Sequence, residues 1–75
     1  MKHFITGYNP KENVQIFKLQ LPLNLSDLTV IMCWADEGEC VFDHELSLDK
    51  ISEIEEISGV ELPRLLDLFL TTESD

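Results

Sequence analysis

Two cysteines and a histidine, Cys33, Cys40 and His44, are residues of types that could hold a metal ion. Structural zinc sites use four cysteine or histidine ligands, commonly with two of them spaced C-x2-C. Here the cysteines are seven positions apart, and a fourth ligand at a standard spacing is missing. We therefore predict no metal ion and no cofactor, and we expect both thiols to be reduced, because disulfides are uncommon in the cytosol.

The same segment contains the residue types of a nucleophilic catalytic site, with Cys40 near Asp43 and His44. Such a site needs the nucleophile, the base and an orienting carboxylate within reach of one another, together with donors for the developing oxyanion. The sequence has no pattern typical of an elbow turn or an oxyanion loop, and its three glycines are too isolated to form a phosphate-binding loop. We predict that the chain is not an enzyme.

The carboxylates are concentrated in the second part of the chain. Residues 1–30 carry three lysines against two carboxylates, whereas residues 31–75 carry thirteen carboxylates against Lys50 and Arg64, and the formal net charge is −10. Because like charges repel, this cluster raises the free energy of the folded state, so it favours a role in binding a basic partner. The alternative is that these side chains are only solvated and keep the protein soluble.

We predict that these carboxylates, together with the single tryptophan, form a partner-binding surface. Trp34 precedes the acidic loop and is either a core residue or an apolar anchor, since tryptophan is enriched in interface hot spots. The predicted surface consists of Trp34, Asp36, Glu37, Glu39, Asp43, Glu45, Glu53, Glu55 and Glu56.

Length and composition limit the fold and the compartment. An apolar fraction of 44% over 75 residues is typical of one small globular domain, residues 1–75. The start of the chain has no signal-peptide pattern, and the longest apolar run is far shorter than the roughly 20 residues that cross a bilayer. A pI near 4.3 disfavours nucleic acid and anionic membranes as partners. We predict a cytoplasmic protein that binds neither.

Residues 2–21 predict an antiparallel β-hairpin. The segments Lys2 to Tyr8 and Val14 to Leu21 are rich in β-branched and aromatic residues, and residues 9–13 have the composition of a turn. If Tyr8 lies opposite Val14, Ile5 lies opposite Phe17, but a shifted pairing is also possible. Both faces of the hairpin carry apolar residues, which suggests a further strand or a partner.

Two helices are predicted after the hairpin. The first spans residues 27–34 with Ser26 as its N-cap, although the apolar, β-branched run from Leu28 also fits a buried strand. The second spans residues 48–58, with Ser47 as N-cap and Gly59 as the left-handed residue that ends it. Its apolar stripe consists of Leu48, Ile51, Ile54 and Ile57.

The remaining segments have weaker patterns. Residues 36–39 fit a loop, and residues 40–42 fit a short extended segment that packs on the core. Residues 63–70 alternate like a strand at Leu66, Leu68 and Leu70 but also present a helical apolar face, and we favour a helix there. Residues 71–75 fit a frayed polar tail. The predicted fold class is α+β, with an N-terminal hairpin followed by two or three short helices.

Three segments, MKHFITGYNPKENVQIFKLQLP, the loop Trp34-Ala35-Asp36-Glu37 and LSLDKISEIEEISGVELP, resemble small acidic immunity proteins. Bacteria make such proteins against cognate toxins, including those of contact-dependent growth inhibition and colicin systems. The resemblance implies a cytoplasmic, non-enzymatic inhibitor that binds a cationic nuclease toxin and covers its active site or substrate groove. A physical argument agrees, because a nuclease must present Lys and Arg to hold phosphates.

Two other functions remain open. A nucleic-acid mimic that inhibits a DNA-binding protein would use the same electrostatics, with carboxylate spacings that follow a phosphate backbone. A small structural or regulatory subunit, or a homodimer, would instead bury the second face of the hairpin, where Phe4, Tyr8 and Ile16 lie.

Overall fold

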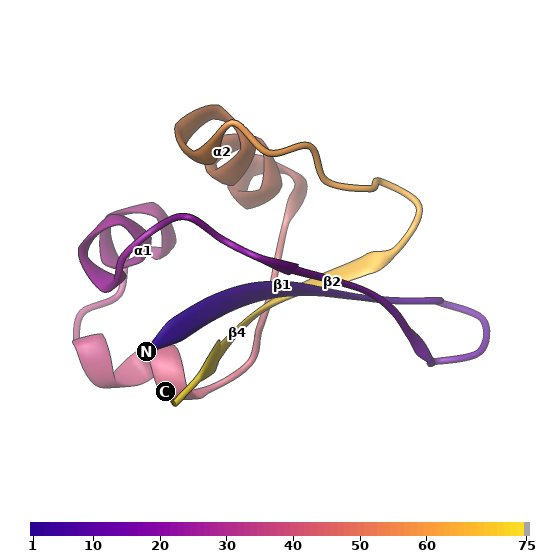
Figure 1. Ribbon diagram of the computed structural model, residues 1–75, viewed down its shortest axis with the longest axis horizontal. Helices are drawn as coiled ribbons and strands as arrows, with labels where there is room; N and C mark the ends of the chain where they lie inside the picture. Colours follow the sequence, from indigo (N-terminus) through magenta and orange to yellow (C-terminus); the bar gives the residue numbers. More distant parts are fainter. Residues whose placement is uncertain (75) are drawn as a thin grey trace.

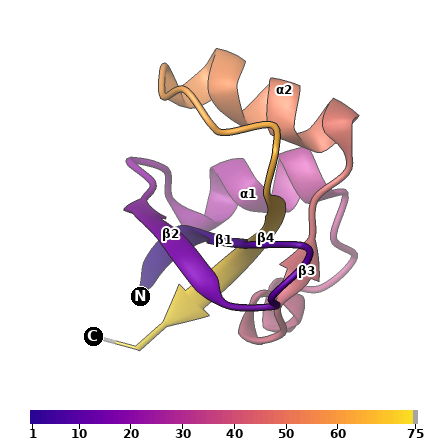
Figure 2. The same ribbon diagram turned by 90° about the vertical axis from the view of Figure 1, so that its right-hand side faces the viewer.

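The four strands in the described part of the chain form one antiparallel sheet. The computed structural model describes residues 1–74, and of Glu37 only the backbone. In chain order its elements are β1 Lys2–Tyr8, β2 Gln15–Gln20, α1 Leu25–Met32, the 3-10 helix η1 Glu37–Val41, β3 His44–Glu45, α2 Leu48–Ser58 and β4 Asp67–Glu73. The strand order is β2-β1-β4-β3, and α1 and α2 lie on the same face of the sheet (Figures 1 and 2). The predicted α+β class is confirmed.

The predicted hairpin is confirmed, but its register differs from the pairing considered first. The backbone amide of Asn9 donates to the carbonyl of Val14 at 2.9 Å, and Ile16 is an extra residue between the pairs Tyr8–Gln15 and Gly7–Phe17. Ile5 therefore lies opposite Leu19 rather than Phe17. This bulge returns the odd-numbered residues of both strands to one face.

Helix α1 exists as predicted but begins two residues earlier. The side chain of Asn24 accepts a hydrogen bond from the Asp27 amide, and the Asp27 carboxylate accepts one from the Asn24 amide, so Asn24 rather than Ser26 is the N-cap. The helix ends at Cys33, whose φ of 56° is left-handed. Trp34, predicted to be in the helix, lies beyond its end.

Helix α2 has the predicted bounds. The Ser47 side chain accepts from the Lys50 amide, and Gly59, with φ of 77°, ends the helix. The predicted apolar stripe is only half correct, because Ile51 and Ile54 are buried while Leu48 and Ile57 are exposed. Only the two middle residues of the stripe therefore belong to the core.

The helix predicted within residues 63–70 is wrong, and this segment leads into strand β4. Residues 71–73 belong to that strand too, so the prediction of a frayed tail there is also wrong, and Asp75 lies outside the described residues. β4 pairs with the free edge of β1 over seven residues and buries Leu68 and Leu70. The cover predicted for the hairpin is thus supplied in part by a strand of the same chain.

The predictions of a loop at residues 36–39 and of an extended segment at residues 40–42 are also wrong, because the 3-10 helix η1 spans Glu37–Val41. Asp36 accepts a hydrogen bond from the Gly38 amide and starts η1, which buries Cys40 and leaves Val41 and Phe42 exposed. The two-residue strand β3 follows η1 and pairs with β4. Local capping by Asp36 therefore determines the structure here, rather than the apolar character of the segment.

The core lies between the sheet and the two α-helices. Its most deeply buried side chains come from the odd positions of β1, the even positions of β4 and the inner faces of both helices: Ile5, Leu28, Ile31, Ile54, Leu68 and Leu70. Gly7 allows close packing there, since a Cβ at this position would lie 2.9 Å from the Leu66 side chain and 3.0 Å from that of Phe17. None of the described helices is long and apolar enough to cross a membrane.

Candidate functional site

The predicted acidic surface is divided between two parts of the molecule. Asp36, Glu39, Asp43 and Glu45 lie on or near η1 and β3, whereas Glu53, Glu55 and Glu56 lie on α2. In both views α2 lies at the top of the molecule and η1 near the bottom, beside the lower part of the sheet, with α1 between them in height (Figures 1 and 2). The Glu37 side chain lies outside what the structure describes. The carboxylates therefore do not form one continuous patch.

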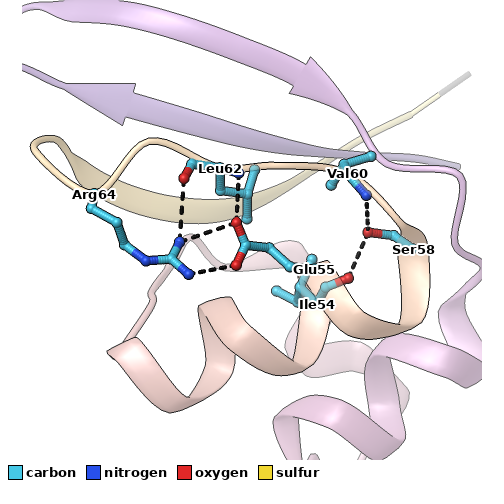
Figure 3. Close-up of polar contacts among 6 residues, drawn as sticks. All are labelled: Ile54, Glu55, Ser58, Val60, Leu62 and Arg64. Atoms are coloured by element: carbon cyan, nitrogen blue, oxygen red, sulfur yellow. Dashed lines mark hydrogen bonds and ion pairs between the residues drawn. The ribbon is translucent and has the colours of Figure 1, made fainter.

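On α2, Glu55 has a structural role. Its carboxylate accepts a hydrogen bond of 2.7 Å from the Leu62 amide and forms an ion pair with Arg64 (Figure 3). The hydrogen bond from the Arg64 side chain, and after it the one from the Leu62 amide, hold the pKa of the Glu55 carboxyl below its usual value. Glu55 thereby fixes the segment between α2 and β4 to the helix.

The other two α2 carboxylates of the predicted surface are exposed, and one of them lies near a lysine. Glu53 lies 3.9 Å from the Lys50 ammonium, and Glu56 is exposed. A shallow depression of about 590 Å³ beside them is lined by Glu55, Glu56, Gly59, Val60, Glu61, Leu62 and Arg64. Because Arg64 neutralises part of this charge, α2 is the less anionic of the two carboxylate groups.

Trp34, predicted as either core or anchor, lies in the core with 9% of its surface exposed. Its ring contacts the imidazole of His44 at a centroid distance of 5.0 Å, and the His44 Nε2 atom lies 2.7 Å from the Glu39 carbonyl oxygen. These contacts hold η1 against the start of β3. We therefore leave Trp34 out of the binding surface.

The residues considered for metal binding and catalysis are not gathered into a site. Cys33 is exposed, Cys40 is buried, and His44 is occupied by Trp34 and Glu39. Among the described side chains, no three His, Cys, Asp or Glu residues are close enough to hold a metal ion. The buried His3 is the other histidine, and its Nδ1 atom lies 2.9 Å from the Thr72 hydroxyl.

One face of the sheet points away from α1 and α2, and the sequence analysis did not predict which residues lie together on it. We call it the open face. It is formed by the even positions of β1 and the odd positions of β4, with their cross-strand partners on β2 and β3. Its central side chains are Phe4, Thr6, Tyr8, Phe69 and Thr71.

Two of the predicted loop carboxylates lie on the open face beside a third that was not predicted. Glu45 pairs with Phe69 across β3 and β4, and Asp67 pairs with Tyr8 across β4 and β1. Asp43 lines a hollow on the same side. Strand order thus brings the exposed Asp67 beside Asp43 and Glu45, two exposed carboxylates more than twenty positions earlier in the sequence.

The hollow has a volume of about 230 Å³ and is lined by Tyr8, Asn13, Asp43 and Phe69. The Tyr8 and Phe69 rings meet edge to face, with centroids 5.5 Å apart and an interplanar angle of 88°. We call it the aromatic hollow. It offers two aromatic rings and one carboxylate to whatever enters it.

Fold and surface together define a small α+β domain with an acidic and aromatic sheet face. Comparison with models of known protein families, with curated proteins and with solved structures finds no match to this chain. The resemblance to bacterial immunity proteins therefore remains a hypothesis from the sequence, and the function has to be argued from the surface.

Proposed function

We propose that this chain is a non-enzymatic binding protein for a basic protein, acting as an immunity-type inhibitor that covers the phosphate-binding surface of a cognate nuclease toxin. The observation that carries the proposal is the uncompensated negative charge near η1 and β3. There is no Lys or Arg between Lys18 and Lys50, and that stretch contains all of the loop carboxylates.

The few basic residues of the chain do little to neutralise this region. Of the five, Lys18, Lys50 and Arg64 form ion pairs with carboxylates outside it, namely Glu73, Glu53 and Glu55. A cationic partner would relieve the repulsion that remains, and opposed charges would accelerate association toward roughly 10⁸–10⁹ M⁻¹s⁻¹ at low salt. Fast association suits an inhibitor that has to act before its target damages nucleic acid.

The test begins with capture of the partner from the host that encodes the chain, followed by mass spectrometry and a nuclease assay of the captured protein. The proposal expects a basic nuclease that loses activity at one equivalent of this chain. A captured partner that is neutral or acidic, or a nuclease that stays active in the complex, would contradict it. Competition by duplex DNA against a captured DNA-binding protein without nuclease activity would favour the nucleic-acid mimic instead.

Two matched triple variants then locate the charge that matters. Glu39→Lys, Asp43→Lys and Glu45→Lys reverse three loop charges, and Glu53→Lys, Glu56→Lys and Glu61→Lys reverse three exposed charges near α2. We expect the loop variant to slow association and to reduce its salt dependence more than the α2 variant does. If neither variant changes the association rate, and binding survives high salt, the partner binds through apolar surface and the proposal is wrong.

A further inference from the structure

The open face already binds one cation, which comes from the chain itself. The ammonium of Lys18, on β2, lies 4.5 Å from the centroid of the Phe4 ring and 2.5 Å from a carboxylate oxygen of Glu73. The ammonium thus makes a cation–π contact with an aromatic ring and an ion pair with a carboxylate. This end of the open face therefore shows that its aromatic rings and carboxylates can together bind a cationic side chain.

The opposite end of the open face carries the same groups without a cation from the described part of the chain. Tyr8 and Phe69 supply the rings, and Asp43 supplies the carboxylate at the aromatic hollow. Among the described residues, no Lys or Arg pairs with Asp43 or lies over either ring. Glu45 and Asp67, cross-strand neighbours of Phe69 and Tyr8, add two further negative charges beside it.

The size of the aromatic hollow selects one class of occupant. Pockets for drug-sized ligands measure roughly 300–1,000 Å³, and this hollow, at about 230 Å³, is smaller and open to solvent. It suits the end of one long side chain. A guanidinium fits better than an ammonium, because its planar group stacks on aromatic rings while its N–H donors bind a carboxylate in pairs.

We propose that the aromatic hollow receives an arginine side chain of the basic partner, stacked against Tyr8 and Phe69 and paired with Asp43. The inference rests on the proposed function, because the arginine belongs to the basic partner. It places the centre of the interface with that partner on the open face, with Glu45 and Asp67 at the rim of the interface. It also assigns the loop carboxylates a role beyond general attraction, because Asp43 fixes one specific contact.

The first experiment uses a capped tetra-arginine peptide and follows the backbone amide resonances of the ¹⁵N-labelled protein. We expect saturable shifts centred on Tyr8, Asp43 and Phe69, weaker binding of tetra-lysine, and no binding of the neutral tetra-citrulline peptide. Shifts spread evenly over all acidic segments, or centred on α2, would overturn the proposal, since they would indicate general charge attraction or another site.

Variants separate a specific contact from general attraction. Asp43→Asn should weaken tetra-arginine binding by about twofold to fivefold, which is typical of an exposed ion pair. The matched control Glu56→Gln removes the same charge on α2 and should change the affinity less. Tyr8→Phe keeps the ring and should bind like the wild type, whereas Tyr8→Leu should also weaken binding by about twofold to fivefold. Equal effects of Asp43→Asn and Glu56→Gln would refute the specific contact.

The natural partner distinguishes failure of this inference from failure of the proposed function. If the captured nuclease is inhibited equally by the wild type and by the Asp43→Asn, Tyr8→Leu double variant, the aromatic hollow is not in the interface although the function stands. If tetra-arginine binds the hollow as expected but no basic nuclease is captured, the site stands and the proposed function fails. Should Tyr8→Leu not fold, the exposed Asp43→Asn substitution still decides the question.

Discussion

Replacing Thr6 by valine is expected to stabilise the protein, whereas most substitutions at buried positions destabilise. Thr6 lies on the open face in the central strand β1, directly opposite Phe69, and only 4% of its surface is exposed. Its hydroxyl oxygen is fully buried and has no hydrogen-bond partner among the described residues. Folding therefore removes this hydroxyl from water without returning a hydrogen bond.

The expected gain follows from the desolvation of that hydroxyl. A buried polar group without a partner costs about 1–3 kcal/mol, and valine has nearly the same shape as threonine with a methyl group in place of the hydroxyl. We expect a gain of about 1 kcal/mol, the lower end of that range, because the new methyl group has to fit a closely packed site. For a domain of this size, such a gain raises the Tm by about 4–8 °C.

Urea unfolding, followed through the fluorescence of the single buried Trp34, measures the effect. Thr72→Val is the matched control on β4, because the Thr72 hydroxyl does have a partner, the Nδ1 atom of His3 at 2.9 Å. That substitution should lower the free energy of unfolding by about 0.5–1.5 kcal/mol. If Thr6→Val lowers the stability as well, the Thr6 hydroxyl is hydrogen-bonded in solution and the reasoning is wrong.

Two further predictions test the core and its pH dependence. Ile54→Ala should lower the free energy of unfolding by about 2–5 kcal/mol, because the Ile54 side chain is 0% exposed. Ile57, on the same helix, is 55% exposed, so Ile57→Ala should change the free energy of unfolding by less than about 0.5 kcal/mol in the same urea assay. Equal losses in the two variants would contradict this packing. Burial, and then the N-terminal ammonium, lower the pKa of His3 below 6.5, so the unfolded chain binds this proton at a higher pH than the folded chain. The contribution of neutral His3 to the free energy of unfolding should be complete above about pH 6.5 and should decline as the pH falls below that value. His3→Gln should flatten this part of the plot of stability against pH. Parallel plots for the wild type and the variant would refute the assignment to His3.

The bounds of helix α2 could be predicted from its sequence because the signals at both ends are local. Ser47 and Gly59 fix its two ends through contacts within one helical turn. Helix α1 was predicted with the wrong N-cap because Asn24 and Ser26 are both good capping residues. The spacing Asn24-x-x-Asp27, a reciprocal capping pair, was the signal that favours Asn24.

Strand β4 was missed because its structure depends on a distant partner. Leu66, Leu68 and Leu70 alternate as in a strand, but residues 62–69 also fit a helical face, and local sequence does not choose between them. The choice is made by the free edge of β1, whose residues Lys2–Tyr8 pair with β4 along its whole length. Pairing between strands so far apart in the sequence cannot be recognised from a short window of sequence.

The same dependence explains why the arrangement of the surface carboxylates could be predicted only in part. The excess of carboxylates is visible in the composition, but their division between η1 and α2 is set by the fold. Asp43 and Glu45 come to lie beside Tyr8 and Phe69 only because β4 separates β1 from β3 in the sheet. Once residues 67–73 are known to be a strand, the alternation of Asp67, Phe69 and Thr71 identifies the outward side chains.

The position of β4 next to β1 has a consequence for synthesis in the cell. Strand β1 leaves the ribosome before the other described elements and obtains its second neighbour only when β4, the last of them, has been translated. Until then β1 exposes an unpaired edge of the kind that invites association between nascent chains. Efficient production should therefore depend on how quickly residues 67–73 leave the exit tunnel, and codon changes that slow translation shortly before them should increase aggregation.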